Sequence, residues 1–265
     1  MPCSKIGIAY ETFVVTHVDF HQVCSSTFVK QIWINSIILQ NPVVSSTIYD
    51  IRYYLKFFWE FIAGFCSVSN STWVDAVTSF SALRIVSPMA IDKQNLRIQA
   101  QIILDSSILT AQVVLTRHLL AIRRTTTENQ FVSGLNANVY LSYSSPDLNN
   151  TNIPKMWPRV YNNCSCLNYR DCPHSILINN SHQQSVTIPG MIGDCFIGDA
   201  TLASTLESYY NSACFSLLHK ESSKNVSLLL NSSSNHFLTN STIQMFFNET
   251  MIDSWSTEIM FESFY

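Results

Sequence analysis

The stretch "TIYDIRYYLKFFWEFIAGFC", residues 47–66, carries the clearest helical pattern in the sequence. Its apolar residues recur at spacings of four and three, which places them on one face of a helix; they are Ile51, Leu55, Phe58, Ile62 and Phe65. The charged residues Arg52, Lys56 and Glu60 fall on the opposite face. The pattern therefore predicts an amphipathic helix that packs one side against a core.

Further helices are expected on both sides of this one. Residues 26–40 form a helical segment ended by Asn41-Pro42, because the residue before a proline avoids the helical conformation. A shorter helix is expected over residues 71–85, and a long one from Ser87-Pro88, with Ser as N-cap and Pro in the first turn. Apolar residues of the long helix keep to one face for about thirty residues; they are Ile91, Ile98, Ile102, Leu109, Val113 and Leu120.

The predicted fold class is mostly α. We expect residues 1–135 to form an N-terminal helical bundle. Residues 136–265 hold most of the cysteines, and we expect an α-rich part with at most a small β element, packed on the bundle or continuous with it as a single domain. Only six glycines in the chain also speak against a turn-rich, all-β fold.

The segment "NCSCLNYRDC", residues 163–172, allows two interpretations. Thiolates of Cys164, Cys166 and Cys172 with His174 have the atom types of a zinc site, but paired C-x-x-C spacing is missing. A disulfide framework is the favoured interpretation, because cysteines and glycosylation sequons both belong to an oxidising compartment. The eight cysteines are Cys3, Cys24, Cys66, Cys164, Cys166, Cys172, Cys195 and Cys214.

One disulfide follows from the helix prediction. If helices 26–40 and 47–66 pack as an antiparallel hairpin, the start of the first lies beside the end of the second. Cys24 then lies close to Cys66, within the Cα separation of about 7 Å that a disulfide needs. Cys195 with Cys214 is a weaker second choice, and the six cysteines other than Cys24 and Cys66 allow 15 pairings that the sequence does not rank.

The composition indicates an extracellular chain. Only 12% of residues are charged, about half the usual ~25%. Glycans would solubilise such a surface, and eight Asn-x-Ser/Thr sequons are present, at Asn70, Asn149, Asn163, Asn179, Asn225, Asn231, Asn240 and Asn248. A net charge of −3 without a basic run argues against nucleic acid binding. No uninterrupted membrane span or signal peptide is visible, so we expect membrane attachment only through segments outside this chain.

Motifs for catalysis or cofactor binding are not recognisable in the sequence. "HVDFH" could align His17, Asp19 and His21 as ligands on one strand, but seven histidines in the chain make such proximity unsurprising. An aromatic group could bind apolar ligands, although core packing is its more common role; it comprises Tyr53, Tyr54, Phe57, Phe58, Trp59 and Phe61. No catalytic residue, metal or cofactor is therefore predicted.

Five stretches resemble a large family of uncharacterised proteins predicted from bdelloid rotifer genomes: "PCSKIGIAYETF", "FHQVCSSTFV", "NCSC", "CFIGDATLASTLESYY" and "NSTIQMFFNETMIDSW". The resemblance covers almost the whole chain and is specific in cysteine placement. It implies an ectodomain with a membrane helix upstream of a Cys-Pro-Cys-Ser motif, and a further cysteine pair and hydrophobic segment downstream. Met1 stands where the first cysteine of that motif would be, and the chain stops short of the final cysteines. We therefore expect an ectodomain from a longer protein.

The expected function is that of a noncatalytic extracellular domain of a membrane-anchored protein, serving recognition, adhesion or gating with an unidentified extracellular partner. Two alternatives stay open, a secreted hydrolase without a recognisable motif and the ectodomain of a cation channel. A glycan-free face shared by several apolar side chains would favour the first interpretation, because such patches mark partner sites. A pocket holding two or more titratable side chains with displaced pKa values would favour the hydrolase.

Overall fold

The computed structural model describes residues 7–40, 54–86, 91–129, 131, 137–143, 154–167, 171–179, 185–219, 229–231, 236–260 and 262. Of these residues 54% are helical and 24% lie in strands. The chain is helix-rich, as expected. The β content, spread over five two-stranded sheets among the described residues, is larger than the small element that was predicted.

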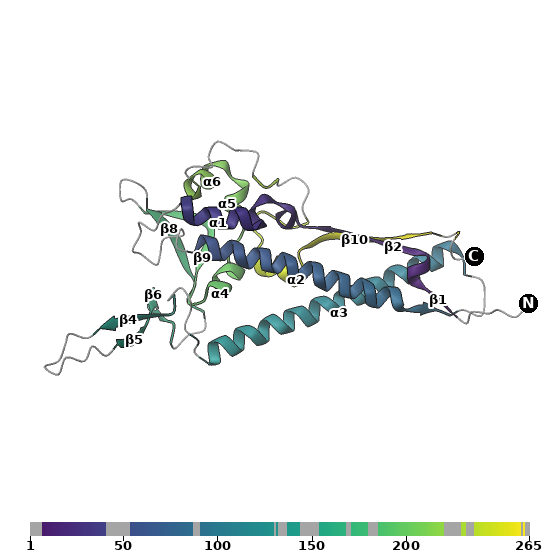
Figure 1. Ribbon diagram of the computed structural model, residues 1–265, viewed down its shortest axis with the longest axis horizontal. Helices are drawn as coiled ribbons and strands as arrows, with labels where there is room; N and C mark the ends of the chain where they lie inside the picture. Colours follow the sequence, from purple (N-terminus) through teal and green to yellow (C-terminus); the bar gives the residue numbers. More distant parts are fainter. Residues whose placement is uncertain are drawn as a thin grey trace, which may run out of the picture.

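Two long helices form the shaft of the molecule (Figure 1). Helix α2 spans Leu55–Ala82 and helix α3 spans Lys93–Glu128, and the two pack side by side. The predicted break between helices 47–66 and 71–85 is wrong, because α2 runs through it. Its polar middle segment is helical as well, and Ser71 donates its hydroxyl to the Ser67 carbonyl one turn back, at 3.2 Å.

The start of α3 also differs from the prediction. Asp92, not Ser87, is the N-cap, and its carboxylate accepts hydrogen bonds from the amides of Gln94 and Asn95 at 2.9 and 3.0 Å. An aspartate there satisfies two helical N–H groups and complements the helix dipole. Ser87 and Pro88 fall in residues 87–90, outside the described residues.

The side of α3 that faces the core is not the predicted apolar stripe. Leu96, Ala100, Leu104 and Ile108, spaced four apart, are the buried residues of this helix. The helix thus has two apolar faces, and α2 together with the neighbouring strand covers only one of them. The predicted N-terminal helical bundle is therefore not confirmed, because among the described residues no helix packs on the other face of α3.

Strand pairing joins the two ends of the chain. Strand β2, Val14–Phe20, pairs antiparallel with β10, Ile252–Ile259, so that Val14 lies opposite Ile259. Strand β1, Ile8–Ala9, pairs with β3, Arg84–Ile85, beside the end of α2. The first and last described segments therefore leave at the same end of the elongated body (Figure 1).

The opposite end is a head of short elements (Figure 1). Its hairpins are β4 (Val139–Tyr143) with β5 (Pro154–Pro158), β6 (Val160–Tyr161) with β7 (Cys164–Ser165), and β8 (His174–Asn179) with β9 (Ser185–Gly193). Its helices are α1 (Gln31–Gln40), α4 (Ile197–Ala203), α5 (Glu207–Tyr210) and α6 (Ser212–Leu218). Helix α7 (Ile243–Asn248) contacts α3 and α4.

Helix α1 is shorter than predicted. Three 3₁₀ turns precede it, η1 (Tyr10–Thr12), η2 (Gln22–Ser25) and η3 (Thr27–Val29), so that only the later part of residues 26–40 is α-helical. Phe28 of η3 is fully buried and stacks on Trp59 of α2, with ring centroids 4.9 Å apart. This contact places the Phe28 ring in the core beside α2.

The main core draws on both halves of the chain. Trp59 donates its indole N–H to the Tyr209 hydroxyl at 2.8 Å, and both side chains are fully buried. The same hydrophobic cluster extends from Val23 to Met251. Residues before and after position 135 therefore share one core.

Candidate functional site

The cysteines of the segment 163–172 form disulfides. Cys164 is bonded to Cys172 and Cys166 to Cys195, with Cα separations of 5.5 and 5.6 Å. Three of these sulfur atoms lie within 4.8 Å of one another, the crowding that a metal cluster would also show. Because all three are oxidised in disulfides, they do not offer the thiolates that zinc requires. We call these two neighbouring disulfides, Cys164–Cys172 and Cys166–Cys195, the cysteine knot, as a label for this pair and not for the three-disulfide motif.

The two predicted disulfide pairs have opposite outcomes. The pair Cys24–Cys66 is confirmed, with a Cα separation of 5.4 Å. The pair Cys195–Cys214 is wrong, because Cys195 belongs to the knot and Cys214 is a free thiol. Cys3 lies outside the described residues. Three disulfides indicate an oxidising compartment such as the extracellular space.

A tight turn and a stacked ring hold the knot in place. Asn162 and Asn163 adopt positive φ angles of 47° and 68° between β6 and β7, the conformation of a two-residue hairpin turn that asparagine tolerates. Tyr161 stacks on His174 with ring centroids 4.0 Å apart. His174, considered above as a zinc ligand, therefore packs as an aromatic ring in the head.

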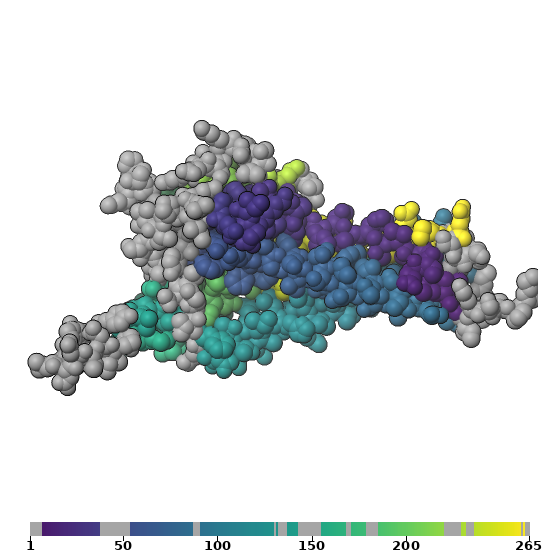
Figure 2. Space-filling model, in the orientation of Figure 1, coloured from purple at the N-terminus to yellow at the C-terminus, as the bar shows by residue number. Residues whose placement is uncertain are grey.

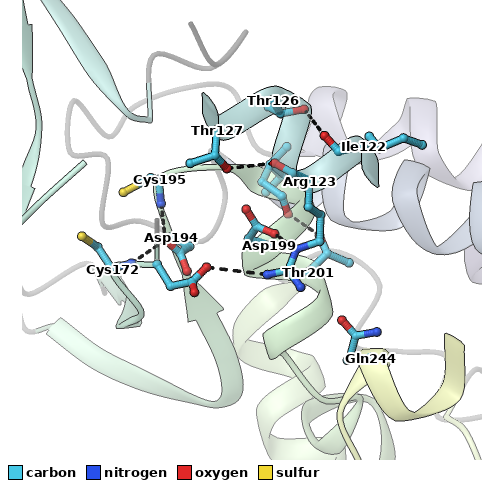
Figure 3. A network of polar contacts seen from close by, with 12 residues as sticks. Ile122, Arg123, Thr126, Thr127, Cys172, Asp194, Cys195, Asp199, Thr201 and Gln244 are labelled. Carbon is cyan, nitrogen blue, oxygen red and sulfur yellow. Dashed lines mark hydrogen bonds and ion pairs between the residues drawn. The ribbon is translucent and has the colours of Figure 1, made fainter. Parts of the chain in front are cut away.

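Asp194 lies between Cys172 and Cys195 and binds the backbone of both (Figure 3). One of its carboxylate oxygens accepts hydrogen bonds from the amides of Cys172 and Cys195, at 2.8 and 2.6 Å. The residue is buried, and this burial raises its pKa to about 6 although both hydrogen bonds act in the opposite direction. Asp194 thus joins the two disulfides through their backbone amides.

Arg123 connects α3 to the head (Figure 3). Its Nε donates a short hydrogen bond to Asp199 in the first turn of α4. Its Nη2 lies 3.6 Å from a carboxylate oxygen of Asp171, next to the knot. Burial raises the pKa of Asp199, and the Arg123 charge partly offsets that rise. One guanidinium therefore ties the end of α3 to both α4 and the knot.

Two hollows meet at this arginine. An apolar pocket of about 260 Å³ lies between α2, α3 and α4, close to the lower limit of typical ligand sites. Its apolar lining residues are Phe61, Phe65, Leu119, Ile122, Phe131, Phe196, Ile197 and Leu202. A charged hollow of about 230 Å³ adjoins it, lined by Leu120, Arg123, Arg124, Thr127, Asp171 and Asp199. Arg123 and Asp199 line both, so the ion pair separates an apolar compartment from a polar one.

The polar groups of the apolar pocket already have partners. Thr126 donates its hydroxyl to the Ile122 carbonyl at 2.9 Å, and Arg123 donates to Asp199. Among the described lining residues Asp199 alone has a displaced pKa. The arrangement can enclose an apolar group and orient a polar one, and it does not bring a base next to a hydroxyl nucleophile.

The other candidates from the sequence are dispersed. His17 is exposed and pairs with Glu258 at 3.5 Å, whereas His21 is buried and stacks on Phe246. They do not share a site with Asp19, which accepts a hydrogen bond from Ser254. In the aromatic group Tyr54, Phe58 and Trp59 are buried in the core and Phe61 lines the apolar pocket; Tyr53 lies outside the described residues.

Every sequon asparagine with a described side chain is exposed; these are Asn70, Asn163, Asn231, Asn240 and Asn248. Asn149 and Asn225 lie outside the described residues, as does the side chain of Asn179. Helix α3 carries no sequon. By length and composition α3 is also the one described helix that could cross a membrane, which by itself is weak support for a span.

The sequence analysis missed the Arg123–Asp199–Asp194 network. Its signal is faint: two aspartates flank Cys195 in "GDCFIGDA", and Arg123-Arg124 ends a long helix. Their proximity depends on tertiary packing.

Comparisons with protein-family models, with curated proteins and with solved structures found no match.

Proposed function

We propose that this chain is a noncatalytic extracellular recognition domain of a membrane-anchored protein, and that it binds a small apolar ligand at the junction of α2, α3 and α4. The observation that carries the proposal is the apolar pocket beside the Arg123–Asp199 ion pair. A concave apolar site with a few convergent polar groups is the usual form of a small-molecule site.

The pocket walls favour binding over hydrolysis. Four aromatic rings offer flat apolar surfaces to a ligand; they are Phe61, Phe65, Phe131 and Phe196. The neighbouring carboxylate of Asp194 is engaged by two backbone amides. A hydrolase would need at least two free titratable groups facing the same cavity, so the hydrolase alternative receives no support from this geometry.

The course of the chain fits attachment to a membrane at one end of the body. Strands β2 and β10 bring the first and last described segments together at the end far from the cysteine knot. The pocket, the knot and exposed Asn163 belong to the other end. Membrane helices on both sides of the chain, as the family resemblance implies, would thus place the pocket away from the membrane surface.

A titration with the neutral fluorophore N-phenyl-1-naphthylamine tests the pocket. We expect saturable binding to the secreted, disulfide-intact chain and about tenfold weaker binding by Phe61→Asp, a loss of about 1.4 kcal/mol. Phe61 is 36% exposed, so this change places a charge in the pocket wall without removing a core side chain.

Two control variants separate the pocket from other apolar surface. Val74→Asp changes an exposed apolar residue of α2, and Leu109→Asp changes one of α3; neither residue lines the pocket. Both should bind the fluorophore like the unmodified chain. Equal weakening in all three variants, or binding that does not saturate, would refute the pocket proposal.

A further inference from the structure

The outward face of α3 is an apolar stripe that the described residues do not cover. Its members are all exposed, by 42% to 62%: Ile98 49%, Ile102 60%, Leu109 62%, Val113 42% and Leu120 45%. Together they are the outer stripe. Figure 2 shows α3 along the lower edge of the molecule. Contiguous apolar patches of this kind mark interaction surfaces.

The spacing of the outer stripe is that of a seam between helices. Ile98, Leu109 and Leu120 recur every 11 residues, and so do Ile102 and Val113. An 11-residue repeat advances by about 3.67 residues per turn, slightly more than the 3.6 of a straight helix, so two helices that pack along it form a slight right-handed supercoil. At ~1.5 Å per residue, the stripe from Ile98 to Leu120 is roughly 33 Å long. A second long helix of matching period would cover it.

We propose that the outer stripe packs against the α3 helix of a second copy of this chain, with the two helices parallel. A second copy supplies a helix of the required period, and the contact is self-complementary about a symmetry axis. The parallel orientation rests on the proposed membrane attachment: the described ends leave together at the end where α3 begins. Copies anchored in one membrane therefore stand side by side with their α3 helices in the same direction.

The residues beside the stripe fit a protein partner. They are mostly uncharged and exposed, and include Asn95, Gln99, Ser106 and Thr110. A helix that lies on an anionic membrane surface carries lysine and arginine along its polar face instead. The absence of a sequon in α3 leaves the stripe free of N-glycans.

A membrane span through α3 would conflict with the contacts that α3 makes beside the stripe and on its buried side. Trp255 of β10 donates its indole N–H to Asp105 at 2.8 Å, and Thr257 donates to the side chain of Gln101 at 2.9 Å. Leu96 and Leu104 are fully buried in the same core. Insertion into lipid would break these contacts, whereas a second copy would leave them in place.

The mass of the secreted chain in solution tests self-association. Analytical ultracentrifugation should give at least twice the mass of the single glycosylated chain, and Leu109→Lys should return it to the single-chain mass. Leu238→Lys is the matched control, because Leu238 is an equally exposed leucine, at 71%, outside α3; its mass should equal that of the unmodified chain. A single-chain mass for the unmodified protein, or an unchanged mass for Leu109→Lys, overturns the proposal.

Cysteine cross-linking tests the orientation. In a parallel pair each position meets its own copy, so Ile98→Cys alone and Leu120→Cys alone should each form a covalent dimer under mild oxidation. In an antiparallel pair that overlaps the whole outer stripe, Ile98 meets Leu120, so only a mixture of Ile98→Cys and Leu120→Cys chains should do so. A Cys214→Ser background removes the free thiol, and Leu238→Cys measures random collisions.

The outcomes separate the two proposals. Cross-links in the mixture alone overturn the parallel arrangement and argue against attachment of both copies to one membrane. A single-chain mass overturns self-association and leaves ligand binding at the pocket, which the fluorophore titration measures, unaffected.

Discussion

Helices α2 and α3 carry similar apolar periodicity and meet opposite surroundings. The face of α2 that includes Leu55, Phe58 and Ile62 is buried under elements from both halves of the chain. The stripe of α3 that includes Ile102 and Leu109 is exposed. Periodicity therefore reveals that a helix has an apolar face, and it does not reveal what covers that face. Four measurements test this difference between the buried face of α2 and the exposed stripe of α3.

The largest effect is expected at the covered face of α2. Trp59→Ala removes a fully buried indole and the partner of the Tyr209 hydroxyl, which should lower the free energy of unfolding by about 3–5 kcal/mol. Chemical denaturation monitored by circular dichroism measures the change. Trp59→Phe, which keeps an aromatic ring, should lose less, and equal losses in the two variants would contradict a packing role for the indole.

The disulfide on the same helix comes next. The Cys24–Cys66 bond closes a loop of 42 residues, and the double variant Cys24→Ala/Cys66→Ala should lose about 4 kcal/mol under the chain-entropy model. Non-reducing peptide mapping confirms that the bond is absent. A chelator should leave the unmodified chain folded; an unfolding transition on chelation would restore the metal interpretation.

The covered core should also respond to acid. Burial lowers the pKa of His21 and of His219 to about 4. Between pH 6.5 and 4 the unfolded chain therefore binds more protons than the folded chain, and the free energy of unfolding decreases as the pH is lowered. Asp194, with its pKa raised to about 6, acts in the opposite direction between pH 6 and 4. At 1.36 kcal/mol per pKa unit, these three groups together give a net loss of about 4 kcal/mol. The lowered pKa of His174 adds to this loss, and the raised pKa values of Asp199 and Asp253 reduce it.

Denaturation at several pH values measures this loss. Asp194→Asn removes the opposing contribution, so the loss between pH 6.5 and 4 should become larger in that variant. Constant stability over this range would mean that the two histidines are not held neutral in the folded chain.

The smallest effect is expected on the outer stripe of α3. Leu109→Ala should change the unfolding free energy of the dilute single chain by less than about 0.5 kcal/mol, because the side chain is 62% exposed. Thermal denaturation over a range of protein concentrations measures it. A loss comparable to that of Trp59→Ala at all concentrations would show that the stripe is covered within the single chain.

Local features made part of the fold predictable. The helix around residues 55–66 and the Cys24–Cys66 bond follow from spacing and from the geometry of a helical hairpin, since both depend on neighbouring segments. The cysteines of residues 163–172 are predicted to form disulfides, but the sequence does not rank their pairing, because Cys166 meets Cys195 only once the β8–β9 hairpin between them has folded. The Cys195–Cys214 prediction is wrong because the helix between these two residues does not decide which cysteine Cys195 meets in the folded chain.

The sequence by itself determined the helix-rich character, the oxidising environment and the apolar periodicity of α2 and α3, because each is a property of residues close together in the chain. The tertiary structure alone decided that β2 pairs with β10, that Arg123 meets Asp199, and that the outer stripe faces outward. These depend on contacts between distant segments. Helix α3 has two apolar faces, and its own sequence does not decide which of them is buried. That depends on the other elements that pack against it.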